Sequence, residues 1–87
     1  MTRADITKEL YMVSCEWHVP VEHIMGNRSK RWRSAVVLAA RATFMRRMLA
    51  AGAPTWAVGQ VIKMPQTSVC DWYARIRKAE REWFGLQ

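Results

Sequence analysis

A run of positively charged side chains stands near the middle of the chain. Between Glu22 and Asp71 there is no acidic residue. Solvated protein surfaces normally mix charges of both signs, so a long one-signed stretch indicates a polyanionic partner. Four of its cations occur close together: Arg28, Lys30, Arg31 and Arg33.

The charge of the whole chain is unevenly divided. Its 87 residues carry a net charge of +7. Residues 1–25 hold two basic and four acidic side chains, a net charge of −2, whereas residues 26–87 hold twelve basic and three acidic side chains, a net charge of +9. We therefore expect the two parts to have different partners, with the polyanion bound by the second.

A second group of polar side chains follows Pro65, at the expected start of a helix. Glutamine pairs bidentately with adenine, and the hydroxyls of threonine and serine hydrogen-bond to several bases. Gln66, Thr67 and Ser68 are therefore candidates for reading bases. Three further polar side chains stand close enough to join them: Lys63, Asp71 and Arg75.

Apolar residues spaced by three and four predict an all-α fold, with one compact helical domain over residues 1–87. Thr2 and Asp5 have the spacing of a capping box. They introduce an acidic helix within residues 1–20, which ends before Pro20 and is expected to pack on the rest of the domain. Its apolar positions are Ile6, Leu10, Val13 and Trp17.

A short helix over residues 21–25 and a long one from about residue 34 are expected next. Gly52 is the expected C-cap of the long helix, since Pro54 follows it. Arg46 and Arg47 are expected to be available to solvent or a ligand. Two adjacent stripes are expected to be buried: Val37, Arg41, Phe44 and Met48, and beside them Leu38, Ala42, Met45 and Leu49.

The last part of the chain has the pattern of a helix-turn-helix. Thr55 is expected to cap a short helix over residues 56–62, and Pro65 to open the last helix. A short helix, a tight turn and a second helix that begins with polar residues is the arrangement that inserts its second helix into the major groove of DNA. The last helix is expected to bury Val69, Trp72, Tyr73, Ile76 and Trp83.

Residues 21–78 resemble the carboxy-terminal DNA-binding domain of the bacterial replication initiator DnaA, a Trp-repressor-like helix-turn-helix. The resemblance rests on Val21-Glu22-His23-Ile24-Met25, the basic run, Ala40-Arg41, Val58-Gly59 and Thr67-Ser68-Val69. It implies that the basic run approaches phosphates and the adjoining minor groove. The DNA-binding residues predicted from the pattern and the resemblance together are Arg28, Lys30, Arg31, Arg33, Arg41, Lys63, Gln66, Thr67, Ser68, Asp71 and Arg75.

The chain departs from that family in two respects. Lys63-Met64-Pro65-Gln66 replaces a longer Gly-Gly-Arg-Asp-His, so the Asp and His that help to read the initiator's binding site are absent. A different target sequence is therefore expected. The sequence also holds no glycine-rich phosphate loop, so the initiator's ATPase domain is not expected here.

We therefore expect sequence-specific binding to double-stranded DNA by a small transcriptional regulator of phage, prophage or gene-transfer-agent type. The acidic first helix is the candidate contact for RNA polymerase or another protein. The alternative is an adapter derived from a DNA-binding module that contacts RNA polymerase or the replication machinery, because Asp71 repels phosphates unless it accepts from a cytosine amino group. Trp83 and Phe84 either close the core or form a dimer contact, so the oligomeric state is open.

Other classes of function find less support in the sequence. Its histidines and acids show no spacing typical of a nucleophile, base and orienting group, so neither an enzyme nor a cofactor is expected. Cys15, His18 and His23 fall short of the four ligands of structural zinc, and both Cys15 and Cys70 are expected to be packing residues. The longest apolar run, residues 35–40, is too short to span a bilayer. A cytoplasmic, nucleoid-associated protein is expected, since the first residues lack the apolar stretch of a signal peptide.

Overall fold

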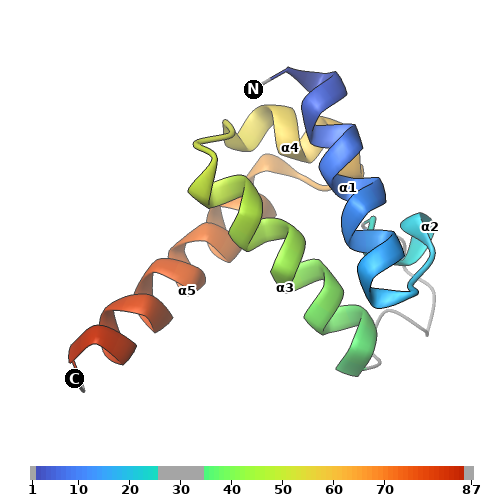
Figure 1. Ribbon diagram of the computed structural model, residues 1–87. Helices are drawn as coiled ribbons and strands as arrows, with labels where there is room; N and C mark the ends of the chain where they lie inside the picture. Colours follow the sequence, from blue (N-terminus) through green and yellow to red (C-terminus); the bar gives the residue numbers. More distant parts are fainter. Residues whose placement is uncertain (1, 26–34, 86–87) are drawn as a thin grey trace.

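The computed structural model describes residues 2–25 and 35–85 and shows an all-α fold (Figure 1). No strand occurs within these residues. Helix α3 packs against α1, α2 and α5, while α4 packs against α1 and α5. The far end of α5 extends away from the other helices (Figure 1). The helices are α1 (Arg3–Trp17), α2 (Val21–Ile24), α3 (Ala35–Ala50), α4 (Thr55–Ile62) and α5 (Gln66–Gly85).

One hydrophobic cluster joins these helices. Phe44, Met45 and Met48 of α3 are fully buried at its centre, among apolar side chains of all the other helices. The first predicted stripe of α3 is confirmed, since Val37 and Arg41 are also buried. The second is wrong at its start, where Leu38 is 38% exposed. The single-turn helix α2 covers the Arg41 side of α3.

Helix α1 begins with the predicted capping box. The Thr2 backbone N–H donates to Asp5 Oδ2 over 3.1 Å, and the Asp5 N–H donates to Thr2 Oγ1 over 3.3 Å. The hydrogen bond from the Thr2 backbone, and then that from its hydroxyl, lower the pKa of Asp5. Ile6, Leu10 and Val13 are buried, whereas Trp17, the last apolar position of this helix, is 37% exposed. The chain turns at His18, in the left-handed region with φ 52°, and Val19 closes this end of the core instead.

Ion pairs connect α1 to α3. Arg47 Nη2 lies 2.5 Å from Glu16 Oε2, and Arg47 Nη1 lies 3.8 Å from Glu9 Oε2. Arg47 is therefore tied to α1, while about a third of its side chain is still exposed to solvent. All three acids of α1, which was the candidate contact for a protein partner, thus have partners within the fold. Glu9 and Glu16 pair with Arg47, and Asp5 caps the helix.

Three further predictions are corrected by exposure. Cys15 and Cys70 are both exposed free thiols rather than packing residues, because each lies on the outer face of its helix. Trp83 is 61% exposed, because α5 continues past the body of the protein. Within residues 2–25 and 35–85, no three potential metal ligands gather. No helix in this part of the chain is long and apolar enough to cross a membrane.

Candidate nucleic-acid interface

A three-residue turn joins α4 to α5. Lys63 ends α4 by adopting a left-handed conformation with φ 56°. The Met64 N–H then donates to the Gly59 carbonyl over 2.9 Å. Helix α5 starts immediately after Pro65, whose carbonyl accepts from the N–H groups of its first turn. The predicted helix-turn-helix connection is therefore present, although Pro65 precedes α5 instead of being its first residue.

Thr55 does not cap α4 as predicted. Pro54 holds the N-cap position, no side chain bonds to the free N–H groups there, and Thr55 is the first helical residue. The Thr55 hydroxyl accepts a hydrogen bond from Gln66 Nε2 over 3.1 Å. This bond connects the first residues of the two helices.

Gly59 lets the turn lie directly on α4. A Cβ atom built at this position would stand 2.7 Å from the Met64 carbonyl oxygen, closer than real Cβ contacts. Only glycine therefore allows the observed approach. A glycine inside an otherwise apolar helix is the sequence signal for such a contact. Gly59 was predicted only as part of the resemblance, and its close approach to the turn was missed.

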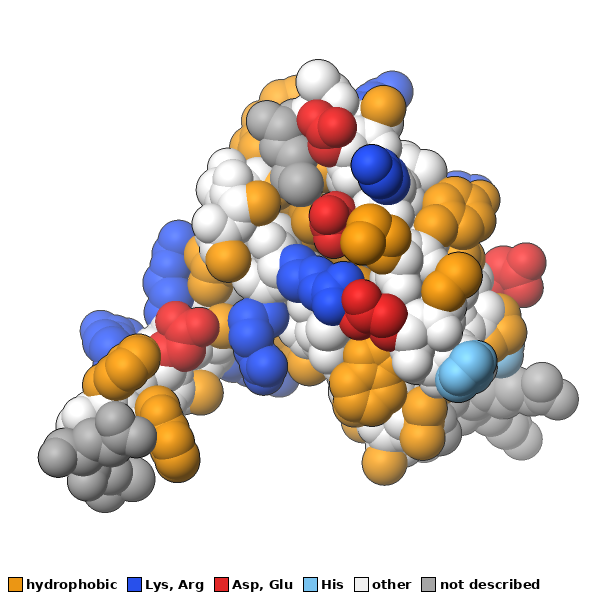
Figure 2. All heavy atoms as spheres, in the orientation of Figure 1, with side chains coloured by type: hydrophobic (Ala, Val, Ile, Leu, Met, Phe, Trp, Pro, Cys, Tyr) orange, Lys and Arg blue, Asp and Glu red, His pale blue; other side chains and the backbone are white. Residues whose placement is uncertain are grey.

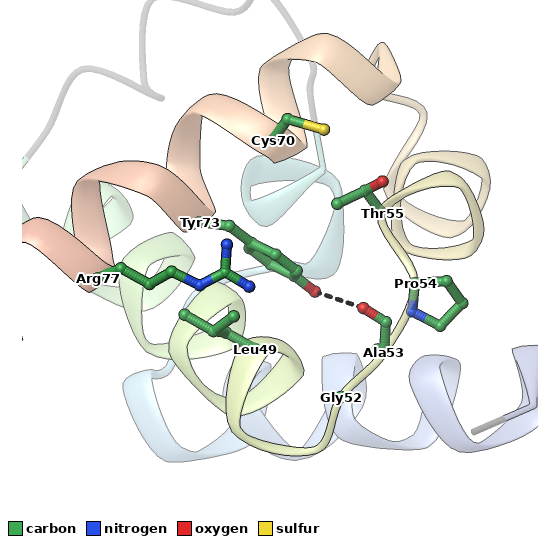
Figure 3. Close-up of a pocket in the computed structure, with 8 residues that line it drawn as sticks. All are labelled: Leu49, Gly52, Ala53, Pro54, Thr55, Cys70, Tyr73 and Arg77. Carbon is green, nitrogen blue, oxygen red and sulfur yellow. Dashed lines mark hydrogen bonds between the residues drawn. The ribbon is translucent and has the colours of Figure 1, made fainter.

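Tyr73 fixes α5 against the chain that precedes α4. Its ring is buried, and its hydroxyl donates to the Ala53 carbonyl over 3.1 Å (Figure 3). Burial raises the pKa of the Tyr73 hydroxyl. A shallow groove of about 270 Å³ lies beside this bond, with Arg77 and Leu49 flanking the tyrosine (Figure 3). With Val69 and Ile76 also buried, α5 has one face held firmly in the core.

The opposite face of α5 is exposed in its first turns, as the base-reading prediction requires. Gln66 and Thr67 are exposed, and Ser68 is half-buried. The bond to Thr55 uses one amide hydrogen of Gln66. Its carbonyl oxygen and second hydrogen are still available for a bidentate contact with a base.

Asp71 and Arg75 form an ion pair on this face. Asp71 Oδ2 lies 3.0 Å from Arg75 Nη2, one helical turn away, and both side chains are exposed. The paired arginine offsets the repulsion that Asp71 would otherwise exert on a phosphate. Figure 2 shows Lys and Arg side chains gathered over α5 and the adjoining part of α3, with acidic side chains among them.

Arg41 is not a DNA-contacting residue, which corrects the prediction. It is 5% exposed, and its guanidinium donates to three backbone carbonyls at the end of α2. The distances are 3.0 Å to Ile24 O, 3.0 Å to His23 O and 2.9 Å to Met25 O. Burial lowers the pKa of Arg41, yet a guanidinium stays charged in proteins. Arg41 therefore anchors the last described residues before the basic run.

The remaining predicted cations divide into two groups. Lys63 is exposed at the turn between α4 and α5. The other four lie outside the described residues: Arg28, Lys30, Arg31 and Arg33.

Comparisons of the chain with protein families, with curated proteins and with solved structures gave no match. The features that define this candidate interface are a glycine-dependent turn, one buried face of α5 and an exposed polar first turn.

Proposed function

We propose that the protein binds double-stranded DNA in a sequence-specific manner and acts as a small transcriptional regulator, with the first turns of α5 in the major groove. The observation that carries this proposal is the exposed start of α5, with Gln66 and Thr67, held by a tight turn against α4. The groove is about 12 Å wide and admits one helix. The resemblance of residues 21–78 to the DNA-binding domain of DnaA supports the same orientation.

Charge supports the proposal independently. Residues 26–87 carry a net charge of +9, while the acids of α1 are held within the fold by Thr2 and Arg47. Contacts to phosphates position a protein on DNA, whereas contacts to base edges give specificity. Exposed Lys63 and the basic run suit the first task, and the start of α5 suits the second.

Binding to duplex DNA is expected to weaken steeply as salt rises. Each neutralised phosphate releases counterion and changes the slope of log affinity against log salt by about 0.9. Replacing Arg31 and Arg33 together with alanine should lower affinity for any duplex and reduce this slope by about 2. Fluorescence anisotropy over a salt series measures both quantities. If no duplex binds, or affinity does not change with salt, the adapter function replaces DNA binding.

Loss of base reading is expected from Gln66→Ala and Thr67→Ala. A site selected from random DNA provides the specific duplex, and a scrambled duplex provides the reference. Each good base contact gives about 1 to 3 kcal/mol of discrimination, so the ratio of the two affinities should fall while non-specific binding is retained.

The same variants separate base reading from helix capping. Thr67 lies inside α5, so its replacement should leave the melting temperature nearly unchanged. Thr7→Ala is the matched control, because that hydroxyl donates to the Arg3 carbonyl on α1, away from the interface. An unchanged affinity ratio in both α5 variants would show that α5 does not read the sequence.

A further inference from the structure

The projecting half of α5 carries an apolar stripe that continues beyond the core. Ile76 is 8% exposed, whereas every residue from 77 to 85 is exposed. This segment extends about 13 Å past the body at about 1.5 Å per residue (Figure 1). At its end, Trp83 is 61% and Phe84 is 70% exposed. Large aromatic side chains exposed together mark an interaction surface.

A groove begins beside this stripe, where α5 diverges from α3. Its volume is about 560 Å³, and Arg46 of α3 forms one wall. The other wall is α5, from Trp72 to Phe84. The surface thus presents both a hollow and two protruding aromatic side chains, which is the property that a self-complementary, two-fold interface needs.

The spacing of the stripe indicates which occupant fits. Positions separated by four, three and four residues are the a and d positions of a heptad, which pack against another helix of the same kind. We infer that this stripe of α5 pairs with the same stripe of a second copy of this chain, in antiparallel orientation. The stripe comprises Trp72, Ile76, Ala79 and Trp83.

The antiparallel orientation follows from what covers the start of the stripe. Ile76 is already buried against its own core, and Arg46 of α3 stands beside Trp72. A parallel partner would bring the two bodies together at this covered part. In an antiparallel pair the tip of each α5 enters the groove beside Trp72 of the other copy, and each body lies beyond the tip of the other copy's α5.

Charge complementarity selects the register. When Trp83 lies beside Trp72 of the second copy, Ile76 lies beside the second copy's Ala79. Arg75 and Glu82, which flank the stripe at equivalent heptad positions, then face each other across the interface twice. Shifting the pair by one heptad would instead oppose Glu82 to Glu82. Trp83 enters the partner's groove in the favoured register.

The area available predicts a weak dimer. Four aromatic side chains, two from each copy, bury on the order of 600 Å². Specific stable interfaces bury about 1,200 Å² or more. Self-association should therefore be reversible and concentration-dependent in the micromolar range.

This pairing has a consequence that rests on the proposed function. In the favoured register the two Gln66 residues are about 35 Å apart along the helix axes, at about 1.5 Å per residue. One turn of B-DNA separates equivalent half-sites by about 34 to 36 Å. A selected site is then expected to be palindromic.

Sedimentation equilibrium without DNA tests the pairing separately from DNA binding. The wild type should show a monomer–dimer equilibrium, and Trp83→Ser should weaken it at least tenfold with an unchanged circular dichroism spectrum. Trp56→Ser is the matched control, because Trp56 is 55% exposed on α4 and outside the stripe. A protein that is monomeric throughout the micromolar range, or a dimer unaffected by Trp83→Ser, would overturn the inference.

Charge exchange tests the register. Arg75→Glu and Glu82→Arg should each weaken self-association, because like charges then meet at both ends of the pair. An equimolar mixture of the two variants should associate at least as well as the wild type, since both contacts become complementary again. Glu80→Arg mixed with Arg75→Glu should give a weaker association. A mixture that fails to recover would refute the antiparallel register.

Discussion

Arg41→Met is expected to be among the most destabilising single substitutions in this protein. Methionine fills much of the arginine's volume but donates no hydrogen bond, so the three carbonyls of His23, Ile24 and Met25 lose this donor. Hydrogen bonds to a charged group contribute about 1.5 to 3 kcal/mol each, and they are not fully additive. A loss of about 3 to 5 kcal/mol in the free energy of unfolding is expected, measured by urea denaturation.

Arg46→Met provides the control on the same helix. Arg46 is exposed, so its replacement should change the free energy of unfolding by no more than about 0.5 kcal/mol. Arg41→Lys should recover only part of the loss, because an ammonium group cannot reproduce the planar fork that spans three carbonyls. If Arg41→Met were as stable as Arg46→Met, the guanidinium would not hold the end of α2.

The sequence predicted the secondary structure well because its signals are local. The capping box at Thr2 and the left-handed Gly52, with φ 72°, depend on residues a few positions away. The buried face of α5 follows from apolar spacing alone, through Val69, Tyr73 and Ile76. The all-α fold was therefore predictable before any tertiary contact was known.

Tertiary contacts explain the errors. Arg41 was assigned to DNA by charge, although its helical stripe already placed it among buried residues. Backbone carbonyls at the end of α2 accept the hydrogen bonds of its guanidinium, and no sequence pattern predicts where these carbonyls lie. Arg47 pairs with Glu16 and Glu9, which stand 31 and 38 residues earlier in the chain. The count of charges placed these acids in residues 1–25 and Arg47 in residues 26–87, and it could not show that the two parts meet. Where a long helix leaves the body, as α5 does after Ile76, apolar spacing also cannot distinguish a buried position from an exposed one.

Gly59→Val is expected to disrupt the proposed interface as well as the fold. The first side-chain atom would meet the Met64 carbonyl oxygen at 2.7 Å, and that oxygen belongs to the backbone of the turn. Relief requires α4 and the turn to separate, which strains the bond between the Met64 N–H and the Gly59 carbonyl. Overpacking of this kind costs about 1 to 3 kcal/mol. Valine gains less than about 1 kcal/mol of helix propensity over glycine.

DNA binding should respond more strongly to Gly59→Val than stability alone explains. Moving the turn shifts Gln66 relative to Thr55, and with it the first turn of α5 that we propose to read bases. Affinity for the selected site should therefore fall at least tenfold under conditions where circular dichroism shows a folded protein. Gly85→Ala is the matched control, because a Cβ at Gly85 meets no atom within 4 Å. A folded Gly59→Val protein with wild-type affinity and specificity would show that the angle between α4 and α5 does not govern recognition.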